Sequence, residues 1–419
     1  MSNYSGTQSI LNRLIPWSLA LLWFMMPVSM KATMLSLWLF SFIVIIQSLI
    51  KRPKITRDQA FLIILPASLF IWLLIVNLSK NSFEDILPFM ERKVSLLLIP
   101  ILLLLSQNIK GMNLKWAMRG FLAGLCITGI HMLFNAGISI VAGNSFSQWT
   151  YHAFTAPYEI GAIYYSWYLS IAIAYLIFSK RDFLIEKYYQ WIILFMLTLL
   201  LLSSSKLFII LVIPLILWSF TTKLKLIKRR LLGLLILILI LAGGAYPFIQ
   251  RMDAISSFDK EIIFQEQYNY DTPFNGITLR LIQWRFGFEI LQESDAWFSG
   301  VGSVSSQALL NEKYREYGIY TGNEEIGDQG YLDYNYHNQY METMLSSGIV
   351  GTILLLMILW SVLISNRKIL IFPSVVFLIT IMFFFTESVL ERQAGILIFC
   401  LMICYAPINR KKIISTDDV

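Results

Sequence analysis

Residues 190–222 read QWIILFMLTLLLLSSSKLFIILVIPLILWSFTT. The interruption Ser203-Ser204-Ser205-Lys206 divides this stretch into two apolar runs, each slightly shorter than the roughly 17–25 residues that cross a bilayer as a helix. The rest of the chain has a similar composition, with 57% hydrophobic and only 14% charged residues among 419. A soluble protein carries about 25% charged residues. The sequence therefore excludes a string of soluble domains and predicts an all-α integral membrane protein.

Apolar runs of this kind recur along the whole chain, and we expect about twelve transmembrane helices. The run that begins near Leu14 is not followed by a small-residue cleavage signature, so we expect a retained span rather than a removed signal peptide. The shared interruption at 203–206 leaves the count open by one pair. The expected spans lie near residues 14–30, 33–50, 59–78, 88–106, 116–142, 160–178, 190–204, 207–222, 231–249, 339–364, 369–386 and 393–408.

The placement of lysine and arginine predicts the orientation. With the N-terminus in the cytoplasm, 21 of the 33 basic residues fall in segments on the inside, mostly in short loops. By the positive-inside rule, both termini are then expected in the cytoplasm. The net charge of +7 is thus a signal of topology and does not indicate nucleic-acid binding.

One long polar segment, residues 250–336, faces the outside in this orientation. It carries fourteen acidic and six basic residues, and its length is typical of a functional loop. Within it, residues 279–291 have the periodicity of an amphipathic helix, and residues 311–317 are compatible with a helical turn or two. We therefore expect four parts: an N-terminal transmembrane bundle of about nine spans, the outer loop, the C-terminal transmembrane helices and a cytoplasmic tail, at residues 1–249, 250–336, 337–408 and 409–419.

Cysteine and histidine usage argues against disulfide and metal chemistry. Cys126, Cys400 and Cys404 all fall in apolar runs, which disfavours a disulfide scaffold or a thiolate metal site. The chain has only three histidines. A single histidine with polar neighbours is therefore the more informative feature.

That histidine is His337, which precedes Asn338 where the long loop re-enters the membrane. At the N-terminal end of a helix, the positive helix dipole disfavours imidazolium and keeps the ring able to accept a proton. Gly348 and Gly351, further along the same span, allow a close approach of a neighbouring helix or a lipid chain. The alternative is an interfacial histidine beside ordinary packing glycines.

Two arginines lie on the predicted helix of the outer loop. Arg280 and Arg285 are five residues apart, so on a helix they point about 140° away from each other. An arginine fork can donate two hydrogen bonds to a phosphate. The alternative for each is a surface ion pair, for example between Arg285 and Glu289 one turn on.

Further charges flank apolar runs on the same outer side. Charges so close to hydrocarbon are costly and usually face a cavity or a bundle interior, although snorkelling to the interface is the alternative for each. Their common side predicts an anion-binding site with one base beside it. The site would consist of Arg92, Lys206, Arg392, Arg280, Arg285 and His337, and Glu387 lies in the outer turn together with Arg392.

Three motifs in residues 200–400 resemble the O-antigen ligase and polymerase family, whose members handle undecaprenyl-linked glycans. The first is His337-Asn338 followed by Gly348-Ile-Val-Gly351. The second is Arg280-Leu-Ile-Gln-Trp-Arg285, which leads into Gly300-Val-Gly302. The third is the turn at residues 387–393, Glu-Ser-Val-Leu-Glu-Arg-Gln. Family members often carry Ser-Arg after the seventh span, whereas this chain has Ser205-Lys206, which keeps the charge but loses the two-pronged fork.

The resemblance implies glycosyl transfer at the periplasmic face of a bacterial inner membrane, without a metal or other cofactor. The donor would be a glycan on undecaprenyl pyrophosphate, and the acceptor a sugar hydroxyl of lipid A–core. His337 would act as the general base. Arg280 and Arg285 would stabilise the leaving pyrophosphate. Substrate-binding residues would be Lys206, Asn338, Arg92, Arg392 and Glu387.

Four functions remain open: a ligase, a polymerase, a transporter or flippase, and a relative that glycosylates protein, which would need an acceptor site for a polypeptide. A ligase and a polymerase would use the same base and the same cations, so the sequence barely separates them. A polysaccharide transporter or flippase would place its polar residues near the middle of the membrane, whereas the unusual charges here gather on one side. This distribution favours an enzyme over a transporter.

Overall fold

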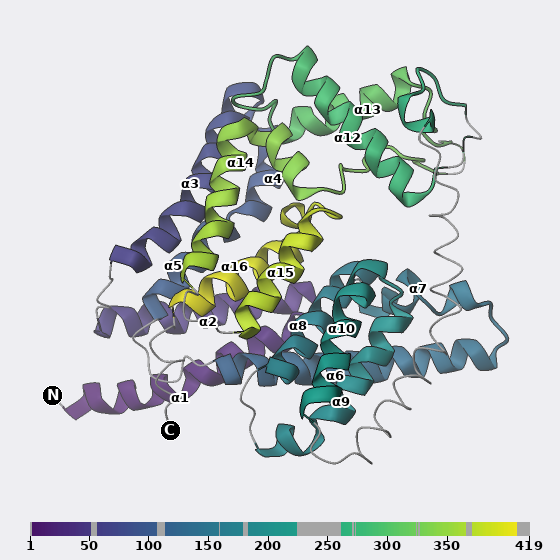
Figure 1. Cartoon of the computed structure of the whole chain (residues 1–419). Helices are drawn as coiled ribbons and strands as arrows, with labels where there is room; N and C mark the ends of the chain where they lie inside the picture. Colours follow the sequence, from purple (N-terminus) through teal and green to yellow (C-terminus); the bar gives the residue numbers. More distant parts are fainter. Residues whose placement is uncertain are drawn as a thin grey trace. The chain divides into compact units, whose positions relative to one another are not determined.

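The computed structural model describes residues 2–51, 57–106, 114–158, 160–178, 183–223, 261–269, 272, 274–323, 325, 327–365 and 371–408 (Figure 1). Across these ranges the chain is helical and contains no β-strand, only one isolated bridge between Asn323 and Asp328. The predicted all-α class is therefore confirmed. The span expected at 231–249 and the tail at 409–419 lie outside the described residues.

Helices occupy the other eleven segments where spans were expected. They are α1 Ser2–Met25, α2 Met30–Lys51, α3 Arg57–Lys80, α5 Ser95–Ser106, α6 Leu114–Val141, α8 Ala162–Phe178, α9 Phe183–Leu202, α10 Lys206–Lys223, α14 Gln339–Ser365, α15 Ile371–Phe384 and α16 Gln393–Ile408. Shorter elements connect them: α4 Phe83–Lys93, α7 His152–Thr155, α12 Gly276–Glu293, α13 Ser303–Glu316 and the 3₁₀ turns η1 Phe146–Gln148, η2 Ala156–Tyr158, η3 Glu261–Phe264 and η5 Val389–Glu391.

Not every helix is long enough to cross a membrane. Three in the described ranges are both long and apolar enough: Met30–Ile50, Leu114–Val141 and Gln339–Val362. A fourth span results if Phe146–Tyr158 and Ala162–Phe178, bent by 81°, count as one. The protein is thus a membrane protein, but twelve spans and the sidedness of the long loop stay predictions.

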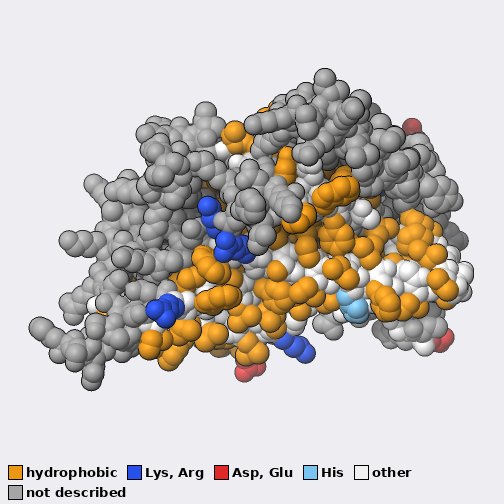
Figure 2. Space-filling model, turned by 90° about the horizontal axis from the view of Figure 1, so that it is seen from below, with side chains coloured by type: hydrophobic (Ala, Val, Ile, Leu, Met, Phe, Trp, Pro, Cys, Tyr) orange, Lys and Arg blue, Asp and Glu red, His pale blue; other side chains and the backbone are white. Residues whose placement is uncertain are grey.

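Large apolar side chains face outward on these helices, as contact with lipid requires. On α6, the exposed fractions of Ile127, Ile130, Phe134 and Ile138 all exceed one half. Figure 2 shows a face on which hydrophobic side chains gather and charged ones are few. An apolar surface of this kind on a monomer marks an interaction site, here with lipid.

The span expected at 88–106 is two helices that meet at Val94. The first, α4, is amphipathic: Ser82 caps its N-terminus and accepts a hydrogen bond from the Asp85 amide, and basic residues fill its last turn. The cap satisfies a backbone N–H that has no partner within the helix, and the basic residues interact favourably with the negative end of the helix dipole. Only residues 96–105 are apolar throughout.

The chain forms two compact units that interleave in sequence. The first takes residues from 1–55, 102–249 and 368–379, and the second from 56–101, 250–367 and 380–419. In the first unit, α6 packs on α1 and α8, and α8 packs on α9 and α10. In the second unit, α14 packs on α3, α12, α13 and α16, so the long loop folds together with membrane helices.

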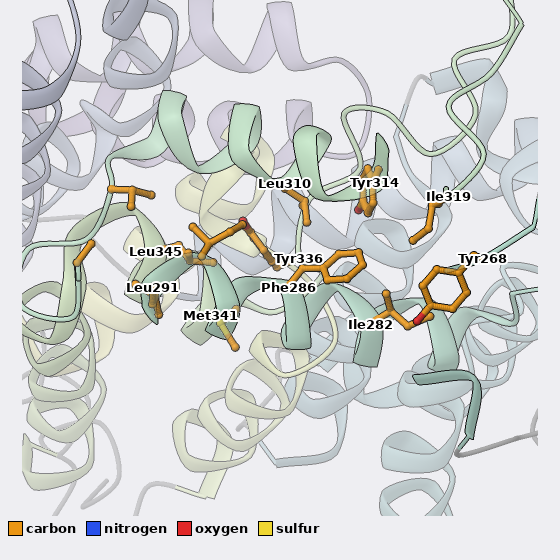
Figure 3. Packing of buried hydrophobic residues seen from close by; sticks show 13 residues of the cluster. Tyr268, Ile282, Phe286, Leu291, Leu310, Tyr314, Ile319, Tyr336, Met341 and Leu345 are labelled. Carbon is orange, nitrogen blue, oxygen red and sulfur yellow. The ribbon is translucent and has the colours of Figure 1, made fainter. Parts of the chain in front are cut away.

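The described part of the long loop has a hydrophobic core of its own (Figure 3). Phe286 and Ile282 of α12 meet Leu310 and Tyr314 of α13, and all four side chains are fully buried. The cluster continues through Tyr336 into Met341 and Leu345 in the first turns of α14. The loop is thereby fixed to the helix that begins beside His337.

At a kink in α14, at Gly348, the helix contacts the long loop. The backbone there has φ +66° and ψ −166°, and the loop at residues 297–301 packs into the break. The Val301 amide donates to the Leu345 carbonyl at 2.7 Å, and the Ile349 amide donates to the Trp297 carbonyl at 2.9 Å. The indole nitrogen of Trp72 on α3 donates to the Ser347 carbonyl at 2.8 Å. Polar groups freed by the kink are therefore satisfied, as buried backbone requires.

Candidate functional site

His337 lies two residues before the first residue of α14, and hydrogen bonds hold the backbone on both sides of it. Its φ is +45°, and its amide donates to Asn335 Oδ1 at 3.0 Å. The next residue, Asn338, caps α14 by accepting hydrogen bonds from the Tyr340 and Met341 amides at 2.9 and 3.1 Å. Asparagine is among the preferred residues for such a cap. The cap fixes the start of the helix and with it the position of the imidazole.

Glu387 joins His337 to Arg280. Its Oε2 lies 3.1 Å from His337 Nδ1, and its Oε1 accepts a hydrogen bond from Arg280 Nη2 at 3.1 Å. The Glu387 side chain is 11% exposed, whereas His337 and Arg280 are each 27% exposed. The carboxylate is thus enclosed, and the two cationic or basic groups reach the surface.

Opposing effects act on the charge of Glu387. Burial raises the pKa of its carboxyl, but the hydrogen bond from His337 and the charges of His337 and Arg280 outweigh burial. The pKa of Glu387 is therefore held below its ordinary value, and the group stays ionised at neutral pH. An ionised partner at Nδ1 favours the tautomer with the proton on Nδ1 and leaves Nε2 as an acceptor. Nε2 makes no hydrogen bond to the described residues.

The turn that carries Glu387 is anchored to two helices. Ser388 Oγ donates to Glu342 Oε2 at 3.1 Å, and the Leu390 amide donates to Gln339 Oε1 at 2.6 Å. Both acceptors stand on the first turn of α14. On the other side, Lys93 of α4 forms an ion pair with Glu391 at 2.5 Å.

Arg285 belongs to a different cluster from Arg280. Its Nε pairs with Glu289 Oε1 at 2.6 Å, and its Nη1 donates to the carbonyls of Ile263 and Gln265 at 2.9 and 2.8 Å. The five-residue spacing predicts this divergence from Arg280. The contacts of Arg285 fix α12 to the segment around η3.

The other candidate residues lie in varied surroundings. Arg92 of α4 reaches the turn, because its Nη1 donates to the Glu391 carbonyl at 3.4 Å. Arg392 is exposed at the end of η5. Lys206 is the first residue of α10 and belongs to the other unit, so the structure does not relate it to His337.

Sequence reasoning missed two members of the network, Lys93 and Glu342. The side chain of Lys93 is 4% exposed, and residue Glu342 is 7% exposed. Glu342 could have been found from the sequence, since an acidic residue in the first turn of an apolar span is rarely without a partner. Lys93 stands in a run of charges, Glu91-Arg92-Lys93, and nothing in that run marks which of them is buried.

The arrangement of His337, Glu387 and Arg280 suits the abstraction of a proton from a substrate that also carries a negative charge. An oriented imidazole has one nitrogen free to take a proton, and a positioned carboxylate stabilises the imidazolium that results. Arg280 provides positive charge on the other side of the same carboxylate.

The sequence of this part of the chain matches the model of a known protein family. Residues 191–356 match the family model described as O-antigen ligase, a stretch that includes Lys206, Arg280, Arg285 and His337 and ends before Glu387. No curated protein matches the chain significantly. The matched family acts on polysaccharides in a membrane as a ligase or polymerase. Over residues 191–356, which make up less than half of its length but include the candidate base, the chain is therefore similar to the O-antigen ligase family.

Proposed function

We propose that the protein is an O-antigen ligase of the bacterial inner membrane. It transfers a glycan from undecaprenyl pyrophosphate to a sugar hydroxyl of lipid A–core at the periplasmic face. The observation that carries the proposal is the contact of His337 Nδ1 with Glu387 Oε2 at 3.1 Å at the start of α14, within reach of Arg280. The family match supports the same reaction class.

His337 acts as the general base in this reaction. Its Nε2 takes the proton of the acceptor hydroxyl as that oxygen forms a bond to the anomeric carbon of the donor. The bond from the anomeric carbon to the pyrophosphate breaks, and the pyrophosphate lipid leaves with the bonding electrons. Glu387 holds the ring and stabilises the imidazolium. A single base that acts on the acceptor hydroxyl fits a single displacement with inversion.

Arg280 stabilises the negative charge that develops on the pyrophosphate. It is 27% exposed, and Glu387 holds one prong of its fork in place. Arg285 contributes by fixing α12, because its own fork is engaged with Glu289 and the η3 segment. Further candidates for holding the donor are Lys206, Arg92, Arg392 and Asn338. Asn338 would act indirectly, because it caps α14 and fixes the start of that helix.

The test is a deletion of the gene complemented by variants. Cells that lack the protein should accumulate long glycan on undecaprenyl pyrophosphate and display bare core, and wild-type protein should restore ligation. His337→Ala should not restore it, although the variant reaches the membrane. Restoration by His337→Ala would exclude the general-base role.

The same experiment separates the competing functions. Core capped by a single repeat unit in the deletion strain would indicate a polymerase. Glycan that accumulates on the cytoplasmic side would indicate a flippase. An unchanged surface glycan and an unchanged lipid carrier would exclude all three.

A further inference from the structure

A row of aromatic side chains ends at His337. The ring of Tyr334 meets the imidazole edge-to-face with centroids 6.1 Å apart, and Tyr331 meets Tyr334 at 5.7 Å. Phe274 continues the row, 5.6 Å from Tyr331. Tyr334 is the most exposed ring of the three, at 45%, so the row opens to solvent beside the candidate base.

The backbone beneath Tyr334 is held firmly although its ring is exposed. Its carbonyl accepts hydrogen bonds from Gln307 Nε2 and from the Tyr314 hydroxyl, each at 3.3 Å. The preceding residue, Asp333, is bound on both sides by Asn311 of α13, at 2.9 and 3.1 Å. An exposed ring on a fixed backbone loses little conformational freedom when a ligand covers it.

The hydroxyl of Tyr334 does not contribute to the packing of the fold. Its hydroxyl makes no hydrogen bond to the described residues, and the ring is absent from the buried core around Phe286. Fully buried tyrosines nearby differ: Tyr336 donates its hydroxyl to the Ser306 carbonyl at 3.1 Å. The exposure of Tyr334 is therefore not a requirement of packing.

We propose that Tyr334 is the platform on which the sugar ring of the acceptor stacks, with its reacting hydroxyl toward His337. The inference rests on the proposed glycan transfer. A pyranose has one face of C–H groups, slightly positive, which fits the negative face of an aromatic ring. Its hydroxyl edge remains free to reach the imidazole.

The order of the side chains along the site indicates where the acceptor and the donor would bind. Contacts run from Tyr334 to His337, then to Glu387, and then to Arg280. A neutral sugar fits the aromatic end, and the pyrophosphate of the donor fits the cationic end. The base lies next to the aromatic end, where a hydroxyl must be deprotonated.

Kinetics of purified full-length protein in lipid nanodiscs test the platform. We expect Tyr334→Leu to raise the KM for the lipid A–core acceptor about fivefold, while kcat and the donor KM stay within about twofold, since an aromatic contact is worth roughly 1 kcal/mol. Tyr334→Phe keeps the ring and should resemble wild type. The matched control is Phe264→Leu, because Phe264 is 73% exposed in the same outer segment and lies outside the row. An unchanged acceptor KM in Tyr334→Leu, or an equal rise for donor and acceptor, would overturn the inference.

Direct binding keeps this test independent of the proposed function. Soluble core oligosaccharide is titrated into wild type and Tyr334→Leu, and contact is followed by saturation-transfer NMR. Weaker contact in the leucine variant supports the platform even if no transfer occurs, in which case only the proposed function fails. Equal contact in both proteins refutes the platform even if wild type transfers glycan.

Discussion

Replacing Gly348 with alanine should destabilise the long loop, residues 261–337, and its attachment to α14. An alanine Cβ would lie 2.1 Å from the Phe298 carbonyl oxygen, and the backbone at φ +66°, ψ −166° is a region that L-residues rarely adopt. Backbone strain of this kind costs about 1–3 kcal/mol. If the 297–301 loop withdraws, two backbone hydrogen bonds are lost at about 1 kcal/mol each. The expected loss in free energy of unfolding is therefore about 3–5 kcal/mol.

The loss can be measured by thermal unfolding of purified protein in detergent. Near-UV circular dichroism reports the aromatic core, and trypsin cleavage within residues 261–337 reports opening of the outer segment. Gly348 belongs to the second compact unit, residues 56–101, 250–367 and 380–419. A unit of about 200 residues loses roughly 2–4 °C of melting temperature per kcal/mol, so we expect a drop of at least about 6 °C. Gly137→Ala on α6 is the control, because its Cβ would meet no atom within 4 Å.

Two outcomes would refute the role of the kink. If Gly348→Ala melts within about 2 °C of wild type and resists trypsin equally, the loop does not depend on the kink. If Gly137→Ala falls by the same amount as Gly348→Ala, the cause is alanine in a membrane helix and not the clash with Phe298.

Three further predictions concern the turn at residues 386–392. Glu387→Gln keeps the shape of the side chain but removes the negative charge beside the imidazole. Because acid–base catalysis contributes about 10²–10⁴ to a rate, kcat for glycan transfer should fall about 100-fold with little change in the acceptor KM. A kcat within about threefold of wild type would contradict this role. Lys93→Met leaves Glu391 without its cation and should cost about 3 kcal/mol in thermal unfolding, whereas loss of a surface pair would cost under about 1 kcal/mol. The pKa of Glu387 is lowered in the fold, so its stabilising effect is present above the ordinary carboxyl pKa of about 4.3 and is lost as pH falls through the lowered value. Melting temperatures should therefore fall more steeply below about pH 4 in wild type than in Glu387→Gln, and parallel curves would refute the ion pairing.

The helices of this protein follow from its sequence wherever a local pattern decides them. Apolar runs predict α2, α6 and α14, because a long hydrophobic segment has few alternatives to a membrane helix. The divergence of Arg280 and Arg285 also follows from spacing alone. In contrast, the expected turn at 311–317 is a helix that begins at Ser303, because the side chain of Asn77 accepts a hydrogen bond from the Ser303 amide at 2.8 Å. A cap from a residue so distant in sequence leaves no trace in local periodicity.

Some residues of the candidate site can also be predicted from the sequence, whereas others depend on tertiary packing. His337 and Arg280 can be singled out from the sequence because each has an unusual place, one at a re-entry point and one in a motif. Their common partner Glu387 can be seen as a charge on the same side, but its bonds to both depend on how α12, α14 and the 386–392 turn pack. The burial of Lys93 depends on the same packing, so a reading of the sequence cannot separate it from Arg92.

The anchored turn also has a consequence for biogenesis. Translation runs from the N-terminus, so Glu387 is made 50 residues after His337 and 107 residues after Arg280. The core around Phe286 can therefore be complete while the imidazole still lacks its carboxylate. Assembly of the His337–Glu387 pair waits until the turn after α15 has been made. Ribosomal stalling or premature termination before Glu387 would leave the core around Phe286 folded but the imidazole without its carboxylate, so activity arises late in the synthesis of each chain.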